Sequence, residues 1–161
     1  MMGAGKTSLG RHISDLTGRE HLDIDQMIVQ RLGRPIPQLF KLYGETAFRE
    51  HEANVLRSIE SQRAVVSTGG GIVMREDNWQ EMKRLGLVIY VKVSYQNLIH
   101  RLELSKKKRP LLDFEDWRER LRQLLEQRTP YYERADLIID ITGLSVDEAA
   151  ELIIERVECQ A

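Results

Sequence analysis

The sequence contains little that points beyond ordinary globular proteins. Cys159 is the only cysteine among 161 residues, so an internal disulfide is excluded, and we expect a reducing, cytoplasmic environment. No apolar run approaches the roughly 20 residues of a membrane span, and the N-terminus carries no apolar signal-peptide core. The net charge is only −1, so no bulk attraction to nucleic acid or to an anionic membrane is expected.

The composition is typical of one globular domain. Hydrophobic residues make up 42% of the chain and charged residues 30%, which excludes a disordered protein. A chain of 161 residues is long enough to bury a sizeable core. The sequence shows no internal repeat, low-complexity segment or linker, so we expect a single domain over residues 1–161.

The chain begins with a glycine-rich turn. Residues 3–7 read Gly-Ala-Gly-Lys-Thr, the second half of a phosphate-binding loop. Its glycines allow a tight turn in which backbone N–H groups point at phosphate oxygens. Lys6 adds a positive charge, and Thr7 supplies a hydroxyl for Mg²⁺. A helix predicted over 7–16 directs its positive N-terminal end at the same anion.

The match to this motif is incomplete. The full pattern is Gly, four residues, Gly, Lys and Ser or Thr, and its first glycine falls one position before Met1. The strand that should lead into the loop is also absent. We therefore expect either a chain start set too late, at an internal methionine, or a truncated chain. The alternative is a chance glycine-rich turn before a helix.

The remainder of the chain alternates between strand and helix patterns, which predicts an α/β fold with a parallel sheet flanked by helices on both faces. Phosphate loops lie at strand-to-helix junctions in this fold class, which favours the phosphate-binding interpretation. Thr129-Pro130 is expected to interrupt a helix, and a mobile loop is expected near 104–114. The predicted strands cover 21–25, 64–67, 87–91 and 137–140, and the predicted helices cover 7–16, 26–31, 35–42, 45–61, 74–85, 94–101, 115–127 and 145–158.

Two carboxylates follow the first predicted strand. If Asp23 and Asp25 both lie in that strand, their side chains point the same way, toward the carboxyl end of the sheet where ligands bind. One carboxylate can then hold Mg²⁺ through its waters, and the other can accept a hydrogen bond from a substrate hydroxyl. Alternatively, the segment is a turn in which Asp25 caps the helix that begins at Gln26.

Three consecutive glycines follow the second predicted strand. Gly69, Gly70 and Gly71 lose much chain entropy on folding, so a solvated turn would rarely use all three. They suit a place where the backbone approaches a ligand closely, although an ordinary flexible loop is the alternative. Arg49 and Arg128 have the planar fork that captures carboxylates, yet each by itself reads as a surface residue.

Six motifs, taken in order, resemble the shikimate kinase family of small P-loop kinases, and they cover essentially the whole chain. They are Met-Gly-Ala-Gly-Lys-Thr at 2–7, Leu-Asp-Ile-Asp at 22–25, Gly-Glu followed by Phe-Arg-x-x-Glu at 44–52, Ser-x-Gly-Gly-Gly at 67–71, Arg-Pro-Leu-Leu at 109–112 and Arg-x-Pro-x-Tyr at 128–132.

The resemblance implies ATP- and Mg²⁺-dependent phosphorylation of the 3-hydroxyl of shikimate, in the pathway to chorismate and aromatic amino acids. It also implies a sheet of strand order 2-3-1-4-5 whose first, central strand is missing here. The expected partners are ATP and shikimate, with no nucleic acid and no membrane, and the expected state is a monomer.

The resemblance also assigns roles to individual residues. Lys6, Asp25 and Arg109 are the expected catalytic residues, with Asp25 a candidate base and Arg109 reaching the phosphates from the lid. Thr7 and Asp23 serve Mg²⁺. Shikimate is expected to contact Asp25, Arg49, Gly69, Gly70, Gly71 and Arg128, with the two arginines on its carboxylate. ATP is expected to contact Gly3, Ala4, Gly5, Lys6, Thr7, Ser8 and Arg109.

Two alternatives to this activity stay open. A gluconokinase-like small-molecule kinase would share the loop and the architecture. A truncated nucleotide-binding module without activity is the other alternative, because removing a central parallel strand exposes two buried sheet edges.

Overall fold

The strands of the protein form two parallel pairs. The computed structural model describes residues 1–61, 63–105, 110–112 and 115–160. In that part of the chain, β1 (Glu20–Asp23) pairs with β2 (Ala64–Ser67), and β3 (Ile89–Lys92) pairs with β4 (Leu137–Asp140). The register sets Asp23 opposite Ser67 at the carboxyl ends of the first pair. This brings two predicted motifs together at one edge.

The order of the pairs agrees with the expected topology. Within the described ranges, β2 hydrogen-bonds only to β1 and β3 only to β4. The pair β1–β2 corresponds to strands 2 and 3 of the family order 2-3-1-4-5, and the pair β3–β4 corresponds to strands 4 and 5. No described strand joins β2 to β3, so each keeps one edge without a strand partner.

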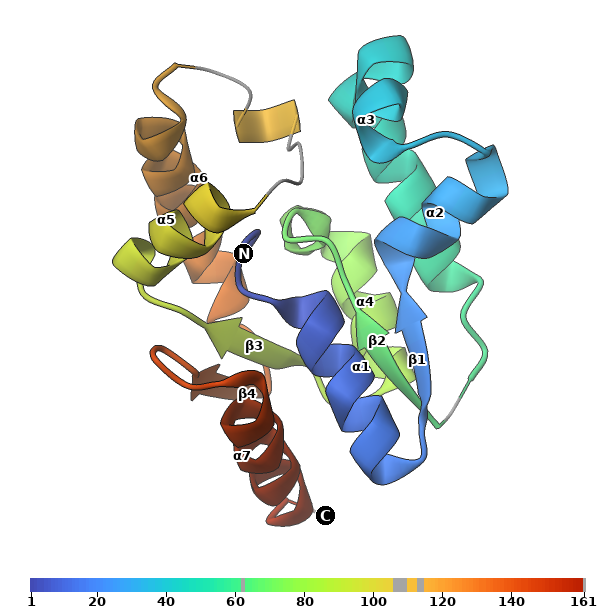
Figure 1. The fold of residues 1–161 in the computed structure, drawn as a ribbon. Helices are drawn as coiled ribbons and strands as arrows, with labels where there is room; N and C mark the ends of the chain where they lie inside the picture. The colour runs from blue at the N-terminus through green and yellow to red at the C-terminus, as the bar shows by residue number, and fades with distance from the viewer. Residues whose placement is uncertain (62, 106–109, 113–114, 161) are drawn as a thin grey trace.

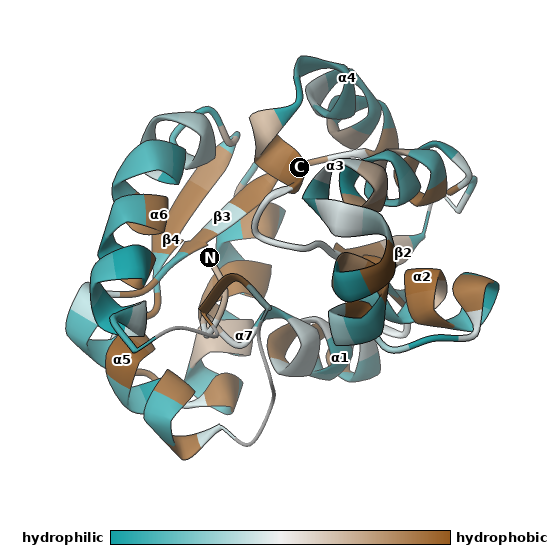
Figure 2. Cartoon of the chain, turned by 90° about the horizontal axis from the view of Figure 1, so that it is seen from above, coloured by the Kyte–Doolittle hydropathy of each residue, from teal (hydrophilic) through white to brown (hydrophobic). Residues whose placement is uncertain are grey.

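Helices cover both sides of the strands, as predicted. In the two views of Figures 1 and 2, α1 and α7 lie on one side of the strand layer, and α3 and α4 lie on the other. The segments α5 and α6 lie toward the β3–β4 side of the molecule. The helices are α1 (Lys6–Thr17), α2 (Ile24–Leu32), α3 (Ile36–Arg57), α4 (Glu76–Leu85), α5 (Tyr95–Leu104), α6 (Trp117–Tyr132) and α7 (Val146–Glu158), with short 3-10 helices η1 (Ile72–Met74) and η2 (Pro110–Leu112).

Local capping explains where two of these helices begin. The Ser94 hydroxyl accepts a hydrogen bond from the Asn97 backbone N–H at 3.4 Å and caps α5, the helix predicted over 94–101. At α7, Ser145 and Glu148 exchange hydrogen bonds between side chain and backbone in both directions. This exchange is a capping box, and it begins the helix that the sequence predicted over 145–158.

Two predicted helix boundaries need correction. The predicted break at Gly44 is confirmed, because its backbone is non-helical with φ 77° and ψ 174° and divides α3 into two helical parts, but α3 ends at Arg57 and not at residue 61. The helix α6 continues through Pro130 to Tyr132, so the predicted interruption at Thr129-Pro130 is wrong. Pro130 has no N–H to donate to the carbonyl four residues earlier, and the buried side chains of Arg128 and Tyr132 offset this loss by holding the last turn in place.

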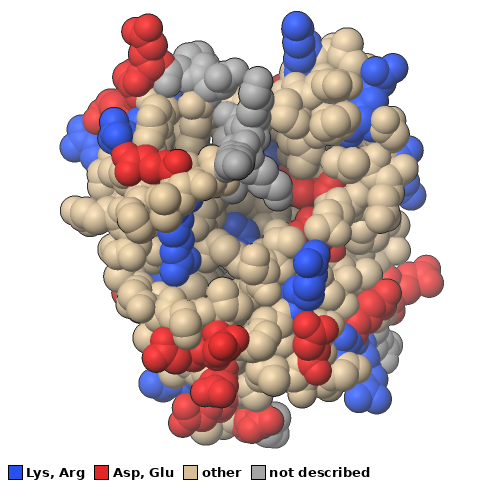
Figure 3. All heavy atoms as spheres, viewed as in Figure 1, with Lys and Arg blue, Asp and Glu red and all other residues tan. Residues whose placement is uncertain are grey.

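The core lies between the strand layer and the helices. Its fully buried members include Ile24, Ile28, Leu56, Leu98 and Leu121. Figure 2 shows the apolar residues gathered on the strands and on the inward helix faces. Figure 3 shows basic and acidic side chains distributed over one outer face, as the small net charge implies. None of the described helices combines the length and the apolar character needed to cross a membrane.

Candidate active site

The glycine-rich turn at the N-terminus leads directly into α1. Gly3 and Gly5 have φ values of 80° and 85°, a left-handed conformation that side chains with a Cβ rarely adopt. The helix begins at Lys6, so its first N–H groups are available to an anion. The turn is closed by Lys6 Nζ, which donates to the Met1 carbonyl at 2.7 Å. Arg101 of α5 supports it by donating to the Ala4 carbonyl at 3.0 Å.

Asp23 connects this loop to the first strand pair. Thr7 Oγ1 donates a hydrogen bond to Asp23 Oδ2 at 2.7 Å. The other carboxylate oxygen, Oδ1, accepts from the Gln26 backbone N–H at 3.1 Å and caps α2. Asp23 is only 7% exposed. Two donors therefore orient the Asp23 carboxylate. It caps α2, and it contacts the Thr7 hydroxyl that is predicted to bind Mg²⁺.

The predicted placement of Asp23 and Asp25 in one strand is wrong. Asp23 is the last residue of β1, and Asp25 lies in the first turn of α2. The cap of α2 is Asp23, not Asp25. Asp23 favours the start of a helix at Ile24 because it satisfies the N–H of Gln26, one of the free N–H groups in the first turn. Both carboxylates nevertheless line the same cavity.

A hydrogen-bonded pair lies behind the phosphate loop. The Ser67 hydroxyl donates to the Lys6 carbonyl at 3.1 Å, and His21 Nε2 lies 3.0 Å from the same Ser67 oxygen. A Cβ at Gly10 would collide with both side chains, so glycine is required there. The sequence assigned His21 no role, and its contacts here support the loop.

Arg49 lies on α3 between two glutamates. Its Nη2 donates to Glu45 Oε1 at 2.9 Å, and its Nη1 forms an ion pair with Glu52 Oε2. Burial by itself lowers the pKa of Arg49, but Glu52 and Glu45 outweigh that effect, and the pKa is raised. The guanidinium is thus held charged and oriented toward the cavity that it lines.

Glu52 is the most buried acidic residue in the described chain. It is 1% exposed, and its Oε1 atom has no hydrogen-bond partner. Burial raises the pKa of Glu52; the charge of Arg49 opposes this rise, and that of Asp25 adds to it. A buried carboxylate oxygen without a donor is costly, which is typical of a site that a ligand or water completes.

The three glycines make room for these charged groups. A Cβ at Gly69 would collide with Glu52 Oε1, and a Cβ at Gly71 would collide with the guanidinium of Arg49. A Cβ at Gly70 would lie 3.2 Å from the Tyr132 hydroxyl. At Gly69 and Gly71 the backbone thus lies close to charged side chains that line the cavity, and the predicted close approach to a ligand stays a prediction.

The predicted site residues surround one cavity of about 850 Å³. Figure 3 shows the hollow between the two upper lobes. Ala4 does not line the cavity, because its side chain is buried at 1% exposure. Arg109 lies outside the described residues, as does most of the predicted lid near 104–114; Pro110 and Leu111 line the cavity. The predicted residues that line it are Gly3, Gly5, Lys6, Thr7, Ser8, Asp23, Asp25, Arg49, Gly69, Gly70, Gly71 and Arg128.

The donor set suits a magnesium ion that arrives with a nucleotide. The described residues include no group of three or more His, Cys, Asp or Glu side chains able to hold a metal by themselves. A hydroxyl and a carboxylate, Thr7 and Asp23, meet in the cavity. Mg²⁺ commonly keeps several waters and binds through one or two protein oxygens plus substrate phosphates, so these residues fit it.

Two residues with contacts to the site were missed as functional candidates. Glu52 and Tyr132 belong to the motifs at 44–52 and 128–132, but neither residue was assigned a functional role from the sequence. The spacing could have found both: Glu52 lies three residues after Arg49, and Tyr132 lies four after Arg128, so each pair shares a helix face.

A left-handed glycine turn that opens a helix beside the end of a parallel strand defines a P-loop protein of the α/β class. A family model described as shikimate kinase matches residues 2–158. The chain belongs to the shikimate kinase family.

Curated relatives extend over nearly the full chain. The shikimate kinase of Thermodesulfovibrio yellowstonii is 37% identical over 158 residues, which covers 98% of this chain and 91% of that protein. The shikimate kinase of Chromobacterium violaceum is 40% identical over 158 residues, which covers 97% of this chain and 85% of that protein.

Solved structures agree with this assignment. The shikimate kinase from Acinetobacter baumannii in complex with shikimate superposes with a TM-score of 0.93 at 36% identity, covering 99% of this chain and 89% of that one. The shikimate kinase from Aquifex aeolicus gives a TM-score of 0.83 at 28% identity, covering 98% of this chain and 92% of that one. The predicted family and fold class are confirmed.

Proposed function

We propose that the protein transfers the γ-phosphoryl group of ATP to the 3-hydroxyl of shikimate, producing shikimate 3-phosphate in the pathway to chorismate and aromatic amino acids. One observation carries the proposal: a single cavity brings a phosphate loop together with two arginines suited to a carboxylate. The similarity to a relative described in complex with shikimate, at a TM-score of 0.93, supports the same substrate.

The geometry suggests how two substrates share the cavity. Asp23 contacts Thr7 of the phosphate loop. Two residues later, the charge of Asp25 helps to raise the pKa of Glu52, which is the ion-pair partner of Arg49. The start of α2 therefore runs from the nucleotide side toward the arginine side. An acceptor whose carboxylate binds Arg49 and Arg128 would present its hydroxyl groups to Asp25.

The residues can perform phosphoryl transfer by positioning and charge neutralisation. Lys6 and the first N–H groups of α1 bind the phosphates, and Asp25 orients the attacking hydroxyl and is a candidate acceptor for its proton. Magnesium bound with the nucleotide at Thr7 and Asp23 supplies neutralisation of the phosphate charge. Arg128 and Arg49 fix the far end of the acceptor, which places its hydroxyl in line with the γ-phosphorus.

We further infer that the protein acts as a cytoplasmic monomer. The described residues of one chain already bring the phosphate loop, both carboxylates, Arg49 and Arg128 into one cavity, which supports a monomer. Its single cysteine, Cys159, is free and exposed, as suits a reducing compartment. Light scattering during gel filtration would measure the mass, and a stable dimer would contradict this inference.

A coupled assay of ADP release tests the proposed function. Shikimate and gluconate are offered separately with ATP and Mg²⁺, and we expect turnover with shikimate only. Lys6→Ala should abolish turnover with little loss of shikimate binding, whereas Lys83→Ala, an exposed lysine of α4, should leave both unchanged. Turnover of gluconate but not shikimate would favour the gluconokinase-like alternative. ATP binding without turnover of either substrate would favour an inactive nucleotide-binding module.

A further inference from the structure

Tyr132 lies behind the glycine wall of the cavity: it contacts Gly70, which lines the cavity, and is not a lining residue itself. It follows Arg128 by four residues on α6, about one helical turn, so both side chains point inward. Arg128 is 4% exposed and Tyr132 is 5% exposed. The Tyr132 hydroxyl donates to the Gly70 carbonyl at 2.6 Å, in the middle of the triple-glycine segment. One helix turn therefore carries both an arginine of the site and a direct contact to its glycine wall.

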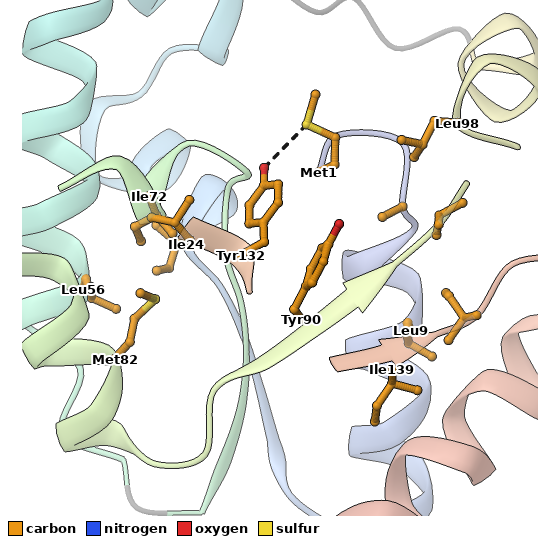
Figure 4. Packing of buried hydrophobic residues seen from close by; sticks show 14 of the residues in the cluster. Met1, Leu9, Ile24, Leu56, Ile72, Met82, Tyr90, Leu98, Tyr132 and Ile139 are labelled. Atoms are coloured by element: carbon orange, nitrogen blue, oxygen red, sulfur yellow. Dashed lines mark hydrogen bonds between the residues drawn. The ribbon is translucent and has the colours of Figure 1, made fainter. Parts of the chain in front are cut away.

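The neighbours of the hydroxyl group link Tyr132 to the other parts of the site. The hydroxyl lies 3.5 Å from Sδ of Met1, at the start of the phosphate loop, as Figure 4 shows. Burial raises the pKa of Tyr132, and the nearby charge of Arg128 opposes this rise. The hydroxyl thus remains protonated at neutral pH and acts as a donor. The short distance to Gly70 makes that contact the dominant one.

The aromatic ring of Tyr132 is fixed from the opposite side. It stacks on the Tyr90 ring of β3, with the ring centroids 4.8 Å apart and the planes at 21°. Figure 4 shows the two rings side by side between β3 and the glycine segment. A buried, stacked ring has few rotamers available, so the position of its hydroxyl is well determined. Gly70 is consequently anchored to a rigid point.

We infer that Tyr132 is a positioning residue for the acceptor substrate, which holds the glycine wall at a set distance from Arg128. This inference rests on the proposed function. Tyr132 acts through Gly70 and Arg128 and is not itself assigned a contact with the substrate. Its loss lets the wall and the arginine move relative to each other. Loss of the Tyr132 hydroxyl should affect the acceptor more than the nucleotide. Its stronger contact is to Gly70 of the acceptor site, and its weaker contact is to Met1 at the start of the phosphate loop.

The substitution Tyr132→Phe tests the inference, since it removes the hydroxyl and keeps the stacked ring. We expect KM for shikimate to rise about tenfold, the loss that one buried hydrogen bond can produce. We expect kcat and KM for ATP to stay within about twofold of wild type. Tyr90→Phe is the matched control: it removes the hydroxyl of the stacking partner and leaves the contact between Tyr132 and Gly70, so KM for shikimate should not change.

The readouts separate a positioning role from a structural one. If Tyr132 had only a structural role, Tyr132→Phe would raise KM for shikimate and KM for ATP by similar factors and would lower the melting temperature. An unchanged KM for shikimate in Tyr132→Phe would overturn the inference while leaving the proposed function intact. A wild-type protein that neither phosphorylates shikimate nor changes its tryptophan fluorescence on titration with shikimate would overturn both.

Discussion

The hydroxyl of Thr7 donates its only proton to Asp23 Oδ2, across 2.7 Å. This bond joins the first turn of α1 to the end of β1, two segments that are separate in sequence. Because the proton is used on Asp23, the lone pairs of Thr7 Oγ1 remain available to a cation in the cavity. The bond therefore prepares a metal-binding oxygen without help from any ligand.

The Thr7–Asp23 bond predicts a specific defect in Thr7→Val. This substitution keeps the shape of the side chain and removes its oxygen, so Asp23 loses a donor and Mg²⁺ loses a ligand. We expect kcat with saturating shikimate to fall about 10- to 100-fold, as for loss of a charge-assisted contact. The shikimate dissociation constant should change less than about twofold, since Arg49 and Arg128 are untouched.

The measurement is turnover as a function of Mg²⁺ concentration, with Thr7→Ser as the control. Serine keeps the hydroxyl, so Thr7→Ser should retain most of the activity. If Thr7→Val matched wild type at every Mg²⁺ concentration, Thr7 would not serve the metal.

Arg49 provides a second prediction, directed at shikimate binding. Arg49→Ala removes a charge-assisted pair worth roughly 1.5–3 kcal/mol, but it also leaves Glu52 buried without its partner. Arg49→Lys keeps the charge and removes the planar fork, so it is the cleaner variant. We expect it to weaken shikimate binding about 5- to 50-fold in a calorimetric titration.

The control for Arg49 is Arg57→Lys, farther along α3, whose partners Asn54 and Asp77 are both outside the cavity lining. It should bind shikimate as wild type does. An unchanged dissociation constant for both Arg49→Lys and Arg49→Ala would remove Arg49 from the carboxylate site.

An ion-pair cluster at the start of α4 predicts how stability depends on acid. Hydrogen bonds from Arg75, together with Arg57, lower the pKa of Asp77 to about 2, from an ordinary value of 3.8. A carboxylate whose pKa is lowered by folding stabilises the protein above its unfolded pKa and loses that contribution as pH falls. The free energy of unfolding should therefore decrease as pH falls from about 4 to about 2.

Asp77→Asn should remove this part of the pH dependence, as measured by urea unfolding at several pH values. At pH 7 the loss should stay below about 1 kcal/mol, because the pair is exposed and screened by solvent. Glu151→Gln, an exposed residue of α7, is the control. An identical slope for Asp77→Asn and wild type between pH 4 and pH 2 would contradict the assignment.

The facing sheet edges provide the last prediction. In the described chain, β2 and β3 each have one strand partner. We expect that a strand of about ten apolar residues, added before Met1, would pair with both edges and hold the glycine turn that follows it in place. The melting temperature should rise by about 5 °C or more, and the affinity for ATP should increase.

A matched extension with proline at alternate positions is the control, because proline cannot donate to a strand ladder. Its melting temperature and ATP affinity should equal those of the unextended protein. Equal values for the apolar and proline extensions would show that neither edge accepts a strand.

Much of the fold was predictable because its signals are local. The capping box at Ser145 and Glu148, the β-branched strand at Ala64–Ser67 and the break at Gly44 depend on a few neighbouring residues. The helix through Pro130 was not predictable in the same way. Its last turn persists because Arg128 and Tyr132 are buried against other segments, a tertiary effect that overrides local preference.

The site was predictable as a set of residues but not as an arrangement. The phosphate-loop residues, the carboxylates, the glycines and the two described arginines do surround one cavity. The sequence placed Asp23 and Asp25 in one strand, whereas the chain turns into a helix between them. Glu52 meets Gly69, and Tyr132 meets Gly70, only after α3 and α6 are packed against the glycine segment.

By itself, the sequence determined the class of chemistry: a glycine turn before Lys6 and Thr7 binds phosphate because of backbone geometry and charge that are local to the loop. The tertiary structure alone decided that Asp23 orients Thr7, that Glu52 is buried against Gly69 and that Tyr132 holds Gly70. These relationships join residues on different segments. Their distances depend on how helices and strands pack, which no local pattern of residues specifies.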